Sequence, residues 1–147
     1  PSMTKLVTIW VRGHGNIKAT HRSTMEITTD NYVTRRGDCI VACCSSESAL
    51  SLRAINLEDL GVVTAIFVVG DLIDVVSGLG YRWVRLSNGR RIVFRRSAYL
   101  DDSTAMILAN KSAKDLDRAI VNKLKVGEPA AVILIVDELE EVKESNA

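Results

Sequence analysis

The sequence predicts a single mainly β domain of the α+β class, an antiparallel β-sandwich or flattened barrel of about nine strands with two helices. Three observations lead to this prediction. Short alternating or apolar segments recur along the 147 residues and are separated by glycine and polar turn residues. Strands follow strands as often as they follow helices, which argues against a doubly wound parallel sheet. The same order of segments occurs twice, which predicts an internal repeat with pseudo-two-fold symmetry.

The repeat is most visible in two helix-like segments, "SALSLRAI" over 48–55 and "SAKDLDRAI" over 112–120. Each runs on to a glycine, Gly61 or Gly127, and then to an apolar run. Further matches, at separations of 65 to 67 residues, are Gly13 with Gly78, Gly15 with Gly80, Ile27 with Ile92, Ile40 with Ile107, and Ala42 with Ala109. We therefore expect one domain over residues 1–147, with repeat halves of about 4–70 and 71–137 and an acidic tail over 138–147.

The elements of the first half follow from their patterns. The leading strand is "KLVTIWVR" (5–12), and alternation in "STMEIT" (23–28) predicts a half-exposed strand. The apolar segment "DCIVACC" (38–44) predicts a buried strand, and a short helix follows over 48–55. The apolar run over 62–69 predicts a strand buried on both faces or nearly so.

The second half begins with "YRWVRL" (81–86), interpreted as the counterpart of the leading strand. The strands "RRIVFR" (90–95) and "TAMILA" (104–109) correspond to the half-exposed and buried strands of the first half. Between the first two of these segments, Asn88-Gly89 predicts a type I′ turn of an edge hairpin.

The helix of the second half has Asn110 as its predicted N-cap. Gly127 and Pro129 are expected to end it, because glycine and proline stop helices. The apolar run over 130–136 then predicts the last strand. Apolar strands such as this one can support a homodimer through an uncovered edge, so both a monomer and a homodimer stay open.

Composition predicts the class of protein. The apolar fraction of 47% and the charged fraction of 25% are those of a globular chain, and no apolar stretch is long enough to span a membrane. The start lacks the pattern of a secretory signal, and all three cysteines lie within six residues, so we expect a cytoplasmic protein without a disulfide framework. Glutamine is absent while charged residues are plentiful, which favours a thermophilic source.

Polar residues gather in the first half, in "GHGNIKATH" (13–21) and "TRRGDC" (34–39). Binding and reactive residues are common in such glycine-punctuated loops. We therefore predict a small binding protein whose polar cleft takes an anionic or polar small molecule. The candidate cleft residues are His14, Asn16, Thr20, His21, Thr24, Glu26, Arg36, Asp38 and Cys39.

An acid–base enzyme that uses His14, His21 and Asp38 is an alternative, because imidazole titrates near neutral pH. Cys39 as a nucleophile is less favoured, since small strand cysteines are commonly buried. No metal is predicted, because neither Cys-x-x-Cys nor another ligand spacing is present. No cofactor is predicted either, since the third glycine of a dinucleotide site and the P-loop lysine are absent.

A second alternative is binding of RNA or single-stranded nucleic acid through the segment 82–96, which carries six arginines and no acid. Arginines neutralise phosphates and exposed aromatic rings stack on unpaired bases. The plain alternative is an edge hairpin whose arginines guard the edge. The net charge of +1 provides no global attraction for nucleic acid. The candidate residues for nucleic acid are Tyr81, Arg82, Trp83, Arg85, Arg90, Arg91, Arg95 and Arg96.

Three segments resemble an uncharacterised archaeal family, domain of unknown function 371. They are "RGHGNIKATHRSTMEIT", "YVTRRGDCIVA" and "RRSAYLDDSTAMILANKSAKDL". The resemblance implies an archaeal source and a mainly β sandwich, and it implies no activity. Members of the family tend to carry a second Gly-His-Pro segment where this chain has "GLGYRW". A symmetric site built from histidines of both halves is therefore not intact here.

Overall fold

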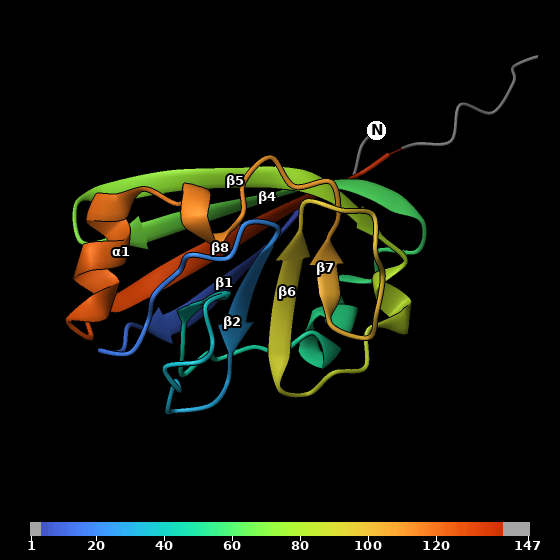
Figure 1. Ribbon diagram of the computed structural model, residues 1–147. Coiled ribbons are helices and arrows are strands. Elements are labelled where there is room, and N and C mark those ends of the chain that lie inside the picture. Colours follow the sequence, from blue (N-terminus) through green and yellow to red (C-terminus); the bar gives the residue numbers. More distant parts are fainter. Residues whose placement is uncertain (1–3, 140–147) are drawn as a thin grey trace, which may run out of the picture.

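The chain folds into two four-stranded β-sheets packed face to face, as seen in a computed structural model that describes residues 4–139 (Figure 1). Sheet A is antiparallel and has the order β1-β8-β4-β5, with β1 Thr4–Arg12, β8 Pro129–Glu138, β4 Leu60–Val69 and β5 Leu72–Tyr81. Sheet B has the order β3-β2-β6-β7, with β3 Ile40–Ala42, β2 Thr24–Thr28, β6 Arg91–Arg95 and β7 Thr104–Met106. The predicted mainly β sandwich is confirmed, with eight strands in the described residues where about nine were expected.

Helices are few and short. One α-helix, α1 Arg118–Lys125, lies at one end of the sandwich and packs on β3, β4 and β5. Three 3₁₀ helices complete the described elements, η1 Leu50–Ile55, η2 Trp83–Arg85 and η3 Ala113–Asp115. The helix predicted over 48–55 is thus a 3₁₀ helix, which ends at Asn56 in the left-handed conformation. Among the described residues, no helix is long and apolar enough to cross a membrane.

The pairing pattern of the first half recurs in the second. Sheet B is mixed: β2 and β6 are antiparallel at its centre, and each has a parallel outer neighbour, β3 and β7 respectively. Three further features recur. The isolated bridge Arg12–Cys43 has its counterpart in Leu79–Ile107, and the residue after each bridge, Cys44 or Leu108, has a positive φ. The hydrogen bond from Trp10 N to Ser46 Oγ corresponds to the one from Ser77 N to Asn110 Oδ1.

The residue equivalences differ slightly from those chosen by sequence matching. Ile27 pairs with Ala42 in the same way that Phe94 pairs with Met106, so Phe94 is the structural counterpart of Ile27. Ile92, the match proposed from the sequence, lies directly opposite Ile27 across the β2–β6 ladder. The two isoleucines are therefore neighbours, because the ladder joins the two halves at their centre.

Sheet A buries only one of its faces. Val63, Ala65 and Phe67 of β4 point into the core and are at most 1% exposed, whereas the alternate residues of the same strand stay partly exposed. The strand over 62–69 is therefore not buried on both faces, as its apolar run predicted. We call the other side of sheet A the outer face; its apolar residues are Leu6, Trp10, Val62, Ile66, Val68, Ile73, Val75, Leu79, Ala131, Ile133 and Ile135.

The predicted strand over 81–86 is wrong. The counterpart of β1 is β5, which ends at Tyr81, and the chain then turns through Arg82, whose φ of 49° is left-handed. This turn starts η2 and directs Trp83 into the core, where it is fully buried and its Nε1 donates to the carbonyl oxygen of Ala105 at 3.0 Å. Tertiary packing of one tryptophan overrides the alternation of the segment.

The predicted edge hairpin at Asn88-Gly89 is also wrong. Gly89 does not have a positive φ, and the Oδ1 of Asn88 instead accepts from the backbone N–H groups of Arg90 and Arg91. The strand that follows, β6, lies between β2 and β7. Its arginines therefore do not guard an edge.

The second-half helix begins later than predicted. Its N-cap is Asp117, whose carboxylate accepts from Ala119 N, and not Asn110. A capping box between Ser112 and Asp115 closes η3 first, and the extended Leu116 separates that turn from α1. Gly127, with a φ of 84°, follows the end of α1 as predicted. Of the acidic tail predicted over 138–147, residues 140–147 lie outside the described residues.

We expect Gly13→Ala to destabilise the fold strongly. Gly13 lies where β1 passes α1, and a Cβ there would lie 1.8 Å from the carbonyl oxygen of Leu124. The helix would have to move, which should lower the free energy of unfolding by at least about 2 kcal/mol. Gly15→Ala is the matched control, because its Cβ would lie 3.8 Å from the nearest atom, the Lys125 oxygen. Urea unfolding measures both, and equal effects would contradict the close approach.

Candidate functional site

The loop that carries His14 is held by contacts within the first half. His14 Nδ1 accepts from the backbone N–H of Asn16 at 3.0 Å, and the imidazole meets the ring of Tyr32 edge to face at 5.0 Å. The Asn16 amide donates to the carbonyl oxygen of Val33 at 2.9 Å. These contacts fasten residues 13–17 to the segment after β2, which is a structural role for both side chains.

His21 closes a turn of its own. Its Nδ1 accepts from the backbone N–H groups of Ser23 and Thr24 at 3.1 and 3.0 Å. The backbone N–H groups of Thr20 and His21 both donate to the carbonyl oxygen of Asp38. The loops that carry His21 and Asp38 are therefore adjacent through their backbones.

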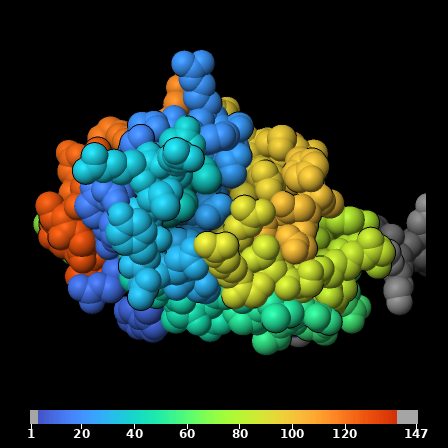
Figure 2. Space-filling model, turned by 60° about the horizontal axis from the view of Figure 1, so that its bottom comes forward, coloured from blue at the N-terminus to red at the C-terminus, as the bar shows by residue number. Residues whose placement is uncertain are grey.

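The predicted cleft residues are only partly brought together. Within residues 4–139, no hydrogen bond or ion pair joins either imidazole to the other, to the exposed guanidinium of Arg36 or to the carboxylate of Asp38. Figure 2 shows the blue and cyan residues of the first half beside the yellow and orange residues of the second on the side of sheet B. The contacts of the site must therefore be sought where the two halves meet.

Glu26 is the predicted residue that does reach this boundary. Its Oε1 lies 3.5 Å from Arg91 NH1 and 3.9 Å from Cys39 Sγ. A polar cleft of about 440 Å³ opens beside it and is lined by Glu26, Thr28, Asp30, Tyr32, Thr34, Ile40, Asn88, Arg90 and Arg91. Burial raises the pKa of Glu26 against the opposing charge of Arg91. We call this site the Glu26 cleft.

The Glu26 cleft does not favour a thiolate or a metal. Burial, together with the charges of Glu26 and Asp38, raises the pKa of Cys39 to about 11, so its thiol is protonated at neutral pH. Nucleophilic attack by Cys39 is therefore not supported. In the part of the chain that the structure describes, no group of three His, Cys, Asp or Glu side chains is placed to hold a metal ion.

The arginine-rich segment is largely neutralised by acids. Four of its six arginines form ion pairs, and the pairs are Arg90 with Asp30, Arg91 with Glu26 and Asp101, Arg95 with Asp101, and Arg96 with Asp115. The rings of Trp83 and Phe94 are buried, so neither can stack on a base. The prediction that Trp83 stacks on nucleic-acid bases is therefore wrong.

Asp101 connects the ion pairs of this region. Its carboxylate lies 3.0 Å from Arg95 NH2 and 3.7 Å from Arg91 NH2, and it accepts from the hydroxyls of Ser103 and Thr104. Burial by itself raises the pKa of Asp101, but the hydrogen bonds from Ser103 and Thr104 and the charge of Arg95 outweigh it and lower the pKa to about 2. The connection from β6 to β7 is thus anchored by a permanent negative charge.

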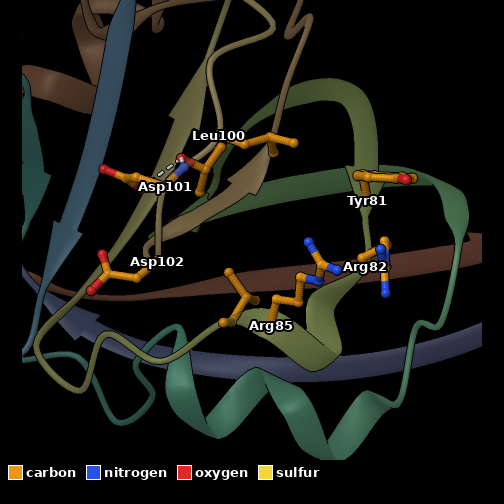
Figure 3. Close-up of a pocket in the computed structure, with 8 residues that line it drawn as sticks. Tyr81, Arg82, Arg85, Leu100, Asp101 and Asp102 are labelled. Carbon is orange, nitrogen blue, oxygen red and sulfur yellow. Dashed lines mark hydrogen bonds between the residues drawn. The ribbon is translucent and has the colours of Figure 1, made fainter.

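Arg82 and Arg85 are the two arginines of the segment that pair with no carboxylate among residues 4–139. Figure 3 shows their guanidinium groups on one side of a pocket, near Tyr81, with Asp101 and Asp102 across from them. The pocket has a volume of about 280 Å³ and is lined by Tyr81, Arg82, Arg85, Leu86, Leu100, Asp101, Asp102 and Thr104. We call this site the Arg82–Arg85 pocket.

Sequence reasoning named the basic wall of this pocket and missed the opposite wall. The residues that it missed are the buried Leu86, Leu100, which is 44% exposed, Asp101, Asp102 and Thr104. The signal that was available is the sequence "YLDDST" just after the arginines, because two adjacent acids there are natural partners for a basic segment.

We expect Asp101→Asn to destabilise the protein in a pH-dependent manner. Because the pKa of Asp101 is lowered from 3.8 to about 2 on folding, its ionised form stabilises the fold above pH 4, and this contribution is lost as the pH falls toward 2. Urea unfolding at pH 7 should show a loss on the order of 2 kcal/mol that shrinks between pH 4 and pH 2. The exposed neighbour change Asp102→Asn should cost less than about 0.5 kcal/mol. A gap that is independent of pH would contradict this account of Asp101.

We expect His21→Ala to lower stability by about 1 kcal/mol, because two backbone N–H groups lose their acceptor. His21→Asn should recover most of this loss, since its Oδ1 can accept from the same groups. Thermal unfolding of the three proteins is the measurement. Stability that is unchanged in both variants would show that the imidazole does not support the turn.

Comparison with known proteins shows the family to which this chain belongs. Residues 9–137 match the model of a family described as "Domain of unknown function (DUF371)". The chain is also similar to "Uncharacterized protein MJ0206" of the archaeon Methanocaldococcus jannaschii, with 37% identity over 131 residues that cover 87% of this chain and 97% of the relative. Both matches extend across both sheets, the Glu26 cleft and the Arg82–Arg85 pocket. The chain belongs to the DUF371 family of proteins of unknown function.

Proposed function

We propose that this protein binds a small anionic molecule in the Arg82–Arg85 pocket. The observation that carries the proposal is the difference between this pocket and the rest of the basic segment. Arg90, Arg91, Arg95 and Arg96 are occupied by acids, whereas no carboxylate of the described chain neutralises Arg82 or Arg85. Two nearby guanidinium groups offer the forked donors that match carboxylate and phosphate oxygens.

The remaining walls favour a ligand that is more than a bare ion. Leu86, Leu100 and the ring of Tyr81 supply apolar contacts beside the guanidinium groups. Asp101 and Asp102 stand on the other side and can accept hydrogen bonds from hydroxyl or amino groups. The volume of about 280 Å³ suits a metabolite-sized molecule with one anionic end and one hydrogen-bond donor.

Backbone strain supports the same pocket. Arg82 is one of five non-glycine residues with a positive φ in the described chain, and its backbone N–H is tied to the carbonyl oxygen of Asp59 at 2.9 Å. A non-glycine residue in this conformation costs free energy and is retained where the surrounding structure requires it. Here the strain places the Arg82 and Arg85 side chains on the same wall while Trp83 between them enters the core.

A second candidate for the same function is the Glu26 cleft, which is larger and also polar. The observation that favours it is Glu26, whose side chain is only 13% exposed and which lies between Arg91 and Cys39. A ligand there would have to compete with existing ion pairs, so a neutral, hydroxyl-bearing molecule suits this cleft better than an anion.

The proposal predicts that Arg85→Ala weakens anion binding about 10-fold or more, because a charge-assisted hydrogen bond contributes roughly 1.5–3 kcal/mol. Isothermal titration with inorganic phosphate, citrate and adenosine monophosphate measures the affinity of wild type and variant. The change removes an exposed side chain, so the thermal unfolding midpoint without ligand should stay within a few degrees.

Arg22→Ala is the matched control, since Arg22 is exposed and lies in no pocket described above. It should bind each anion as the wild type does. An equal loss in Arg22→Ala and Arg85→Ala would show general electrostatic attraction in place of a site. Binding that is lost in Glu26→Gln and kept in Arg85→Ala would move the function to the Glu26 cleft.

A further inference from the structure

The outer face of sheet A is an apolar surface that no described element covers. Trp10 is 64% exposed, Ile73 62% and Leu6 60%, although all three lie on regular strands of a sheet. Figure 1 shows sheet B and α1 on the same side of sheet A, which leaves the other side open. Large apolar side chains exposed in this number on one face of a sheet are typical of an interaction site.

The chemistry of the outer face is nearly uniform. Its polar positions away from the ends carry only the hydroxyls of Thr8, Thr64 and Ser77. The charged side chains on its strand positions are Arg12 at one end of β1 and Asp137 near the opposite end of β8. Such a surface offers no charge pattern by which to select an acidic or basic partner.

The size of the face is close to that of a stable interface. Four strands spaced about 4.8 Å apart, each contributing about nine residues at 3.3 Å, give a flat footprint of roughly 550 Å². The protruding side chains of Trp10, Leu6 and Ile73 enlarge the accessible area beyond this footprint. Stable protein interfaces bury about 800 Å² per partner, so one sheet of this size can supply one half of a standard interface.

We propose that the occupant of this face is a second copy of the same chain, packed sheet to sheet in a two-fold symmetric dimer. An isologous interface requires a surface that matches itself, and an apolar face with its charges only at the two ends meets this requirement. If the two copies are related by an axis that lies between the sheets and runs across the strands, Arg12 of one copy lies over the end that carries Asp137 of the other. The two charges at the ends of the face are then complementary instead of opposed.

The composition of the eight residues after Leu139, "EEVKESNA", does not suit them to cover the outer face. They contain four charged side chains within five positions and no apolar run that would match the face. Stacked sheets pack about 10 Å apart with interdigitated side chains. The outer face carries side chains of different size, such as Trp10, Ile133 and Val75, and these can interdigitate with those of a second copy. The proposed dimer differs from one formed through a strand edge, because no strand of one copy would pair with the edge of β1 or β5 of the other.

Analytical ultracentrifugation tests the proposal directly. The wild type should sediment at twice the chain mass of 16.1 kDa at micromolar concentration. The double change Trp10→Lys and Ile73→Lys should shift it to the monomer, because a buried interface does not tolerate unpaired ammonium groups. Both positions are more than half exposed, so circular dichroism should show an intact fold.

Val126→Lys is the control, since Val126 is 75% exposed at the end of α1 and not on sheet A. It should leave the dimer intact. A monomeric wild type would overturn the proposal, whether or not it binds phosphatidylcholine vesicles through this face. A dimer that survives the double change would also overturn it and would point to strand-edge pairing. Should the double variant unfold, Ile73→Lys alone at the edge strand must still weaken the dimer at least 10-fold, and an unchanged dimer would refute the face.

Discussion

Neither sheet can form from one half of the chain alone, and this interlocking is the constraint on which the rest of the structure depends. β1 of the first half pairs with β8 of the second half, and β5 of the second half pairs with β4 of the first. The central pair, β4 with β8, also joins the two halves. At the centre of sheet B, β2 of the first half likewise pairs with β6 of the second. The chain must therefore complete β8, the last strand of the described residues, before sheet A closes, and long-range pairing of this kind makes folding slow and cooperative.

The interlocking also explains where the polar groups lie. Where β2 meets β6, side chains of the first half face side chains of the second, and the pairs of Glu26 with Arg91 and Asp30 with Arg90 cross this boundary. Asp101 extends the same network from β6 toward β7. The ion pairs thus join the two halves on the outside of sheet B, whereas the apolar core joins them on the inside.

The sequence was sufficient to predict the mainly β sandwich and most of its strands, because alternation and apolar runs report directly on strands. It was insufficient at Trp83, where a left-handed Arg82 turns an apparently alternating segment into a 3₁₀ helix. It was also insufficient for the arginines, because Arg90 and Asp30 are 60 positions apart and only the fold shows that they pair. The candidate loops with His14 and His21 looked like a site because histidine serves equally well as a backbone acceptor and as a catalytic base.

The two exposed sides of the sandwich carry opposite chemistry. The outside of sheet B is occupied by charged pairs that hold the halves together, while the outer face of sheet A has hardly any charge. Tyr81 lies at the end of β5, on the outer face, and also lines the Arg82–Arg85 pocket. A ligand in that pocket would therefore touch the margin of the surface through which two copies are proposed to pack. Any effect of pocket occupancy on the strength of the dimer would be matched by an equal effect of dimer formation on the affinity of the pocket, because such a coupling is reciprocal.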